Sequence, residues 1–166
     1  MLDIRVASET QRPILERMVQ LYLHDLSEFT REDAGTQVRF DYDLLIRYWR
    51  EDGRYPRLFY MGENPCGFAL IRTLPSDDLT KRVYQMAEFF VMRAHRGTGI
   101  GERAACMLFE AFPGEWRVAQ EEENTDATSF WRRVIARYTG GRFEEGRSGP
   151  PEGPVGPMQI FRSPAD

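Results

Sequence analysis

Glycines and basic side chains are concentrated in one short part of the chain. They are Arg93, His95, Arg96, Gly97, Gly99 and Gly101. An apolar run at 89–91 precedes them, and apolar residues with helical spacing follow over 100–111, which indicates a strand, a turn and a helix. The first amide N–H groups of a helix have no partner within it, and glycines let an anion approach them closely. This pattern favours a phosphate-binding turn.

Two tighter nucleotide-binding motifs do not fit this turn. Glu102 stands directly after Gly101, so the spacing departs from the dinucleotide-binding fingerprint at its third glycine. No Lys followed by Ser or Thr comes after the glycines, as a P-loop requires. The alternative to a cofactor site is an ordinary glycine-rich turn between a strand and a helix.

The stretch resembles motif A of the GCN5-related N-acetyltransferase (GNAT) superfamily, in which Arg/Gln-x-x-Gly-x-Gly/Ala follows a strand. Arg96, Gly99 and Gly101 fill that pattern. The resemblance implies that backbone amides of the turn hold the pyrophosphate of acetyl-CoA, the cosubstrate. It also implies that the preceding strand binds the thioester and the pantetheine.

A second motif of the family, Asn-x-x-Ala-x-x-Phe-Tyr, is matched by Asn124, Ala127 and Phe130. Trp131 stands where the family usually has the tyrosine that protonates the departing thiolate, and an indole N–H cannot serve as that acid. Three alternatives stay open: Tyr138 on the same helix, a water molecule, or CoA binding without efficient transfer. For Tyr138 we favour a core aromatic residue that closes the helix. The cofactor-binding residues that the resemblance implies are Phe90, Val91, Arg96, Gly97, Thr98, Gly99, Ile100, Gly101, Asn124 and Phe130.

The implied reaction is direct attack of a primary amine on the thioester in a ternary complex, without a covalent enzyme intermediate. An alkylamine with a pKa near about 10.4 arrives as ammonium and must lose a proton first. Glu88 is the candidate base, because it lies on the strand before the turn among Ala87, Phe89 and Phe90. Apolar neighbours raise the pKa of a carboxyl group. The alternative is an edge or bulge carboxylate that faces water.

Length and composition predict one N-acetyltransferase domain over residues 1–166. The chain has 42% hydrophobic and 29% charged residues and a net charge of −4. That charge argues against a nucleic-acid surface and suits a cationic acceptor, either a small amine or a peptide amine. No segment is long and apolar enough for a membrane span or a leader, so a cytoplasmic protein is expected. In that compartment Cys66 and Cys106 are expected to be reduced thiols that pack in the interior. No His or Cys stands near either one at the spacing of a metal site.

The remaining pattern predicts an α+β fold with a mixed, mostly antiparallel sheet and about four helices, as the resemblance implies. Strands are expected near 4–6, 58–61, 67–71, 83–91, 116–119, 143 and 158–161. Helices are expected from a capping box at Ser8 and Gln11 to about residue 26, from Asp41 or Asp43 to Gly53, over 100–111, and from Asn124 to Gly140. Residues 27–41 are expected to form a loop, and a disordered tail from Gly146 is the alternative to the last strands.

Several expectations concern partners. Tyr22, His24, Asp25 and Glu28 lie near the end of the first predicted helix, either beside an acceptor substrate or simply in solvent. An exposed last strand would allow pairing in a homodimer. A regulatory acetyl-CoA sensor without turnover is the alternative to an enzyme, and the missing tyrosine favours it slightly.

Overall fold

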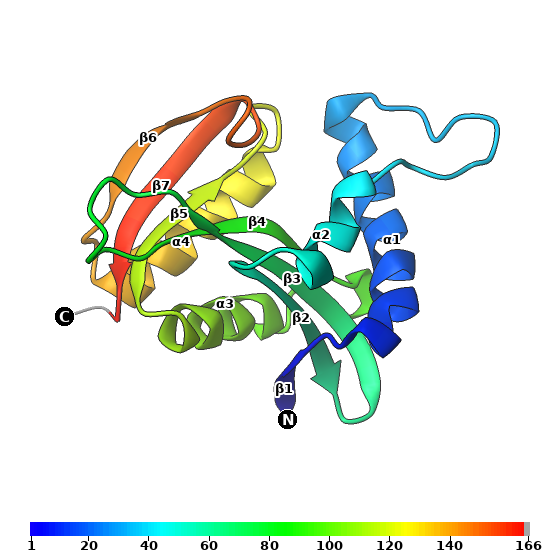
Figure 1. The fold of residues 1–166 in the computed structure, drawn as a ribbon, viewed down its shortest axis with the longest axis horizontal. Helices are drawn as coiled ribbons and strands as arrows, with labels where there is room; N and C mark the ends of the chain where they lie inside the picture. The colour runs from blue at the N-terminus through cyan, green and yellow to red at the C-terminus, as the bar shows by residue number, and fades with distance from the viewer. Residues whose placement is uncertain (165–166) are drawn as a thin grey trace.

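The computed structural model describes residues 1–164, which form one seven-stranded sheet with helices on both faces (Figure 1). The strands are β1 (Leu2–Val6), β2 (Arg54–Met61), β3 (Asn64–Leu74), β4 (Val83–Val91), β5 (Gly114–Ala119), β6 (Glu144–Ser148) and β7 (Gly156–Ser163). The α-helices are α1 (Arg12–Thr30), α2 (Arg47–Arg50), α3 (Ile100–Ala111) and α4 (Thr125–Thr139). Short 3₁₀ helices span Glu9–Gln11, Asp43–Ile46 and Arg93–His95.

The sheet has the order β1-β2-β3-β4-β5-β7-β6. Only β4 and β5 are parallel neighbours, and every other pair is antiparallel. The crossover between them contains α3, since parallel strands need a long connection. The predicted α+β fold with a mostly antiparallel sheet is therefore confirmed.

Local sequence signals account for most element boundaries. The side chains of Ser8 and Gln11 form the predicted capping box, and Pro13 lies in the first turn of α1. The Asn124 side chain accepts a hydrogen bond from the Ala127 N–H at 3.1 Å and caps α4. Gly140 ends α4 with φ +62°, a conformation that glycine adopts without strain.

Two helices differ from the predictions. Helix α1 continues to Thr30, about one turn beyond the predicted end, and stops where Arg31 adopts φ +59°. The second helix is a 3₁₀ turn followed by the single turn α2, and neither start has a side-chain cap. So short a segment gains little from helix propensity, and its shape is set by packing of Leu45 and Tyr48 on the sheet.

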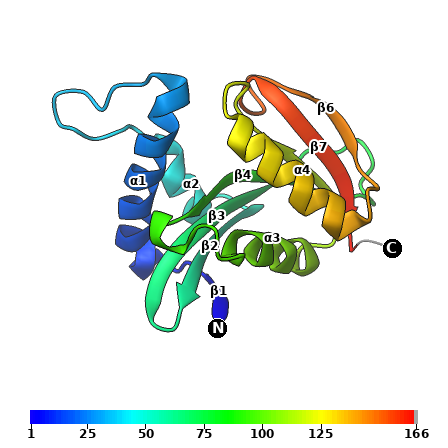
Figure 2. The same ribbon diagram turned by 180° about the vertical axis from the view of Figure 1, so that it is seen from behind.

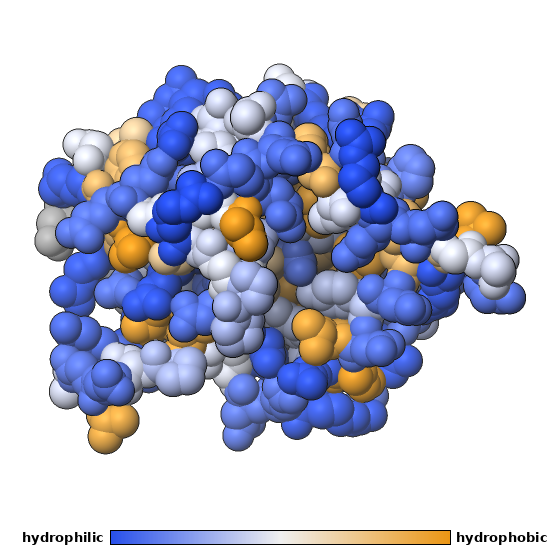
Figure 3. Space-filling model, turned by 90° about the horizontal axis from the view of Figure 1, so that it is seen from above, coloured by the Kyte–Doolittle hydropathy of each residue, from blue (hydrophilic) through white to orange (hydrophobic). Residues whose placement is uncertain are grey.

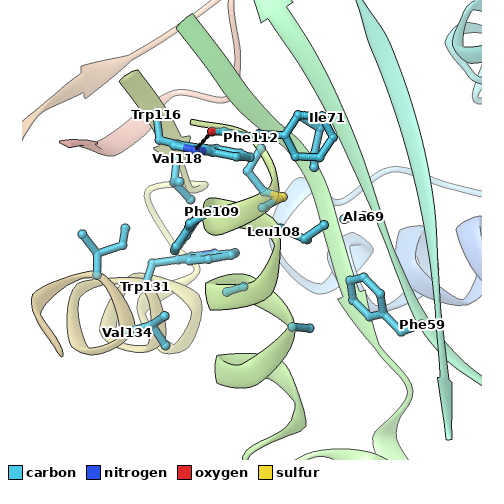
Figure 4. Packing of buried hydrophobic residues seen from close by; sticks show 14 of the residues in the cluster. Phe59, Ala69, Ile71, Leu108, Phe109, Phe112, Trp116, Val118, Trp131 and Val134 are labelled. Atoms are coloured by element: carbon cyan, nitrogen blue, oxygen red, sulfur yellow. Dashed lines mark hydrogen bonds between the residues drawn. The ribbon is translucent and has the colours of Figure 1, made fainter. Parts of the chain in front are cut away.

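Each face of the sheet has its own apolar core. On one face α1 and α2 cover Leu58, Phe68 and Leu70, while α3 and α4 cover the other face (Figure 2). Alternation along β3 sends Leu70 to the first core and Ile71 to the second. In Figure 4, residues of α3, α4, β3 and β5 fill the second core, and the Trp116 indole donates to the Phe112 carbonyl at 3.0 Å.

The C-terminal segment is ordered into β6 and β7, so the prediction of two last strands is confirmed over the described residues. The expectation of an exposed last strand is wrong, because β7 lies between β5 and β6. The edges of the sheet are β1 and β6. The face seen in Figure 3 is largely hydrophilic, with apolar residues scattered over it. Within residues 1–164, no helix has the length and apolar character of a membrane span.

Candidate active site

The parallel strands β4 and β5 pair only over part of their length. Their register runs from Val83 opposite Glu115 to Met86 opposite Val118. Residues 87–91 of β4 continue beyond that point and pair with β3 alone among the described strands. Backbone groups on one side of this segment are thereby left for a ligand.

The glycine turn lies at the end of β4 and begins α3. Gly97 and Gly99 have φ of +73° and +81°, and a Cβ on either would have no heavy atom within 4 Å. The first hydrogen bond of α3 runs from the Arg103 N–H to the Gly99 carbonyl at 3.1 Å. The amides of residues 100–102 precede that bond and form the positive end of the helix dipole. The turn therefore offers open space, free amides and positive potential for a pyrophosphate.

Basic side chains flank the turn and are held by one carboxylate. Arg96 donates through Nε to the Val91 carbonyl at 2.7 Å and through Nη2 to Asp25 at 2.6 Å. Arg93 donates to the other oxygen of Asp25 at 2.7 Å. These ion pairs lower the pKa of the Asp25 carboxyl group against the opposing effect of its burial. Asp25 thus ties α1 to the turn.

A groove of about 570 Å³ runs from this turn between α1 and α4. Of the cofactor-binding residues predicted from the sequence, the groove is lined by Phe90, Val91, Arg96, Gly97, Gly99, Gly101, Asn124 and Phe130. The structure does not bring the other two side chains to it. Ile100 is buried in the core, and the Thr98 hydroxyl donates to the His95 carbonyl at 2.7 Å.

A second cavity of about 420 Å³ contains Glu88. A bulge in the β3–β4 ladder at Ala87 precedes Glu88, which lies opposite Leu70 and faces the α1 side of the sheet. Tyr22 of α1 donates to Glu88 Oε2 at 2.5 Å, and Tyr42 donates to Oε1 at 2.8 Å. Glu88 is therefore paired directly after the bulge, and its carboxylate accepts hydrogen bonds from two hydroxyl groups inside a cavity, unlike the edge or bulge carboxylate facing water that was the alternative.

Burial dominates the electrostatics of this cluster. It raises the pKa of Glu88, and nearby Glu121 adds to the increase, while the hydrogen bonds from Tyr22 and Tyr42 and the charge of Arg72 oppose it. Burial and the Glu88 charge also raise the pKa of both tyrosines, so both hydroxyls stay protonated near neutral pH. The same two causes raise the pKa of Tyr48 to about 12. A carboxylate with a raised pKa beside permanent hydroxyl donors is suited to accept a proton.

The two cavities meet. Six residues line both of them: Tyr22, Leu26, Phe89, Asn124, Ala127 and Trp131. A ligand held at the glycine turn can therefore reach the space that holds Glu88.

Trp131 packs at this junction and is only 6% exposed. Its ring centroid lies 4.9 Å from that of Phe89, 5.0 Å from Phe130 and 6.4 Å from Phe109. Figure 4 shows the indole extending from α4 beside Phe109 of α3. Its surroundings are those of a packing residue.

We expect the Trp131→Phe variant to keep most of the wild-type rate. Phenylalanine preserves the aromatic contacts, and the indole that it replaces cannot act as a general acid. Steady-state kcat with an acceptor amine, CoA affinity by calorimetry and Tm check this. Loss of turnover at unchanged affinity and Tm would assign the indole a role in the reaction.

Tyr138 lies away from this junction. Its hydroxyl donates to Glu110 at 2.6 Å and lies 2.8 Å from Ser163 Oγ, and its ring packs on Phe109 and Phe161. It lines neither cavity. The helix geometry that would bring Tyr138 to the site is not present, and its place is that of the core aromatic residue.

Sequence reasoning missed most of the second cavity. Tyr42, Tyr48, Arg54, Arg72 and Glu121 all line it, and none lies in a motif. Among residues noted near the end of α1, Tyr22, Asp25 and Glu28 reach the site. The His24 ring lies against Phe40 at 6.5 Å. Within residues 1–164, no cluster of side chains is suited to bind a metal ion.

Comparison with known proteins agrees with this geometry. A family model described as the acetyltransferase (GNAT) family matches residues 15–135. An acetyltransferase from Thermus thermophilus is similar with a TM-score of 0.67 at 18% identity, covering 98% of this chain and 97% of that one. A GNAT-family acetyltransferase from Staphylococcus aureus has a TM-score of 0.64 at 13% identity, with coverages of 98% and 99%.

A third similar structure is an aminoglycoside acetyltransferase from an uncultured soil metagenomic sample, in complex with sisomicin. It has a TM-score of 0.61 at 18% identity, with coverages of 80% and 86%. At these identities the solved structures establish the fold alone. No curated protein matches the sequence significantly. Because the family match spans most of the chain and includes β4, the glycine turn and most of α4, the chain belongs to the GNAT acetyltransferase family.

Proposed function

We propose that the protein transfers an acetyl group from acetyl-CoA to a primary amine. The observation that supports this most is the junction of two cavities, one ending at a glycine turn and the other containing a half-buried carboxylate. Acetyl-CoA supplies the acetyl group as a thioester: the neutral amine nitrogen bonds to the carbonyl carbon, the carbon–sulfur bond breaks, the amine loses one proton and the sulfur gains one. An acceptor that arrives as ammonium releases one further proton, which leaves to solvent.

The groove residues suit this cosubstrate. Gly97 and Gly99 leave an open cradle that a Cβ would fill, and the first amides of α3 are suited to its pyrophosphate. Arg96 and Arg133 also line the groove and add positive charge. The edge of β4 over residues 87–90, which has no described strand beside it, is suited to the amide groups of the pantetheine arm.

Glu88 is the group we assign to take the proton of the acceptor ammonium. Each carboxylate oxygen has two lone pairs and accepts one tyrosine hydrogen bond, so each can accept a further one. Burial brings the pKa of Glu88 towards that of a base useful near neutral pH. The two tyrosines fix the carboxylate at the bulge, which orients it towards the cavity.

Tyr22 is the group we assign to pass a proton towards the groove, in place of the family tyrosine. Its hydroxyl bonds to Glu88, and the residue lines both cavities. A hydroxyl can release its proton on one side while it receives another from the protonated Glu88. Tyr42 also bonds to Glu88, but of the two cavities it lines the one that contains Glu88 and not the groove.

We expect Tyr22→Phe to lower kcat about tenfold or more, the low end of the range for proton transfer by a positioned group. Tyr42→Phe is the matched control, since it removes one hydrogen bond to Glu88 without interrupting the path to the groove. Presteady-state kinetics of both variants measure the chemical step. Equal losses in the two variants would reduce Tyr22 to a residue that positions Glu88.

Thiol release from acetyl-CoA with a panel of amines tests the proposed function, with mass spectrometry of the acetylated product. Amine-dependent release and an amide product are expected. Tight acetyl-CoA binding without release for any amine would contradict the proposal and favour a sensor.

A further inference from the structure

The cavity that contains Glu88 carries charges of both signs. Glu88 and Glu121 contribute carboxylates, and Arg54 and Arg72 contribute guanidinium groups. An acceptor with an amine as its only polar group would need the carboxylates alone. The presence of two guanidinium groups in this cavity therefore needs a separate explanation. The explanation given below rests on the proposed function.

Sheet register places these groups on one face in two rows. Arg54, Arg72 and Gln85 lie opposite one another across β2, β3 and β4. Leu70, two residues before Arg72, lies opposite Glu88. Residues two apart along a strand share a face and lie about 7 Å apart. A basic row thus adjoins the position of Glu88 within one cavity.

Arg54 already has a counter-ion, and Arg72 does not. Arg54 donates to Glu51 at 3.0 Å, and its guanidinium lies over the Tyr48 ring. Arg72 donates through Nε to Gln85 Oε1 and through Nη2 to the Glu152 carbonyl at 2.6 Å, both neutral acceptors. No carboxylate among residues 1–164 forms an ion pair with it.

Arg72 is nevertheless held in place. Gln85 is only 4% exposed, and its amide nitrogen donates to the same Glu152 carbonyl at 2.8 Å. The Nη1 group and one Nη2 N–H have no partner among the described residues, and they present a fork suited to two oxygens of one anion. A half-buried cation without a counter-ion is costly unless a ligand supplies one.

Glu121 lies on the cavity wall after β5 and is also unpaired within the described chain. Burial raises its pKa, with Glu32 and Glu123 adding to the increase. Its charge adds to the raised pKa of Glu88 and of Tyr22. It lies three residues before Asn124, which lines both the cavity and the groove. The cavity is therefore acidic where the amine must react and basic at the row of Arg72.

We propose that the acceptor is a primary amine that also carries an anionic oxyacid group, a carboxylate or a phosphate, and that Arg72 binds this group. The ammonium lies at the Glu88 and Glu121 end. The anion accepts hydrogen bonds from the free Nη1 and Nη2 N–H groups of Arg72 and supplies the negative charge that this guanidinium group lacks.

Matched acceptors test this with the wild-type protein. The panel contains the common amino acids and γ-aminobutyrate, the amide of each, and aminoethyl phosphate with ethanolamine as its neutral partner. We expect kcat/KM to be at least about tenfold higher for the anionic member of the best pair, the size of one charge-assisted hydrogen bond. Transfer to amides or other amines without such a preference overturns the inference and leaves acetyl transfer standing. No transfer to any amine overturns the proposed function itself.

Two variants assign the effect to Arg72. Arg72→Gln is expected to raise KM about tenfold for the anionic acceptor and to leave KM for its amide and for acetyl-CoA unchanged. Arg72→Lys restores the charge without the fork and is expected to recover part of the loss. Arg117→Gln is the matched control. Arg117 is on β5, opposite Gln85 of β4, and forms an ion pair with Glu115, but it does not line the cavity. Equal KM changes for the anionic acceptor and its amide in Arg72→Gln would contradict the assignment.

Discussion

Replacement of Glu88 by glutamine is expected to lower kcat/KM about a hundredfold to ten-thousandfold near neutral pH, the usual loss when a general base is removed. Glutamine keeps the shape and can keep both tyrosine contacts, because its oxygen accepts from one hydroxyl and its amide donates to the other. Affinity for acetyl-CoA should not change, since the glycine turn lies beyond the end of β4.

The dependence of the rate on pH shows whether Glu88 acts as a general base or has only a structural role. Glu88 must be ionised to act, and burial raises its pKa, so the wild-type rate should fall with acid above the usual range of glutamate. Glu88→Gln should lack that fall. Its deficit should shrink as pH rises, because more of the amine is then already neutral. Parallel profiles with similar rates would assign Glu88 to structure, and an unchanged Tm controls for folding.

Replacement of Gly99 by valine is expected to weaken CoA binding about a hundredfold, or roughly 3 kcal/mol, the value of two charge-assisted hydrogen bonds. Gly99 has φ +81°, where a β-branched residue is strained. Relief of that strain moves the amides at the start of α3, and the new methyl groups occupy space that is open in the wild type.

Gly62→Val provides the matched control. Gly62 has φ +63° with nothing within 4 Å of a Cβ, and it lies in the β2–β3 hairpin, away from both cavities. Both variants should lose stability from the same kind of strain, but only Gly99→Val should lose CoA affinity by calorimetry. Unchanged affinity in a folded Gly99→Val protein would refute a pyrophosphate site at the turn.

Local patterns account for the conformation of the turn and for the start of α4 beside the groove. The glycines at 97 and 99 are needed where φ is positive, and Asn124 caps α4 through a contact three residues away. The bulge at Ala87 has no such local cause. A sequence shows a carboxylate among apolar residues, but the direction in which it points depends on the register of β3 against β4.

The second cavity depends on contacts that are distant in sequence. Tyr42 and Glu88 are 46 positions apart, and Tyr42 follows a loop without periodicity. Arg72 meets the Glu152 carbonyl across 80 positions. Neither pair has a spacing signal, because the partners are brought together by packing of α2 and of the β6–β7 connection on the sheet. The second cavity, the proposed acceptor site, was therefore the part that sequence patterns could not predict.

The β6–β7 connection has a consequence for how specificity can change. Pro150, Pro151 and Pro154 line the cavity, and the segment is anchored to the sheet through the Glu152 carbonyl and through the Val155 carbonyl, which accepts from the Glu122 N–H at 2.9 Å. Prolines restrict the backbone before any ligand binds, so little conformational entropy is lost on binding. The segment lies outside the paired residues of β6 and β7, which end at Ser148 and Gly156, so exchange of residues 149–155 is expected to change which acceptor the proposed site binds while the sheet and both cores are retained.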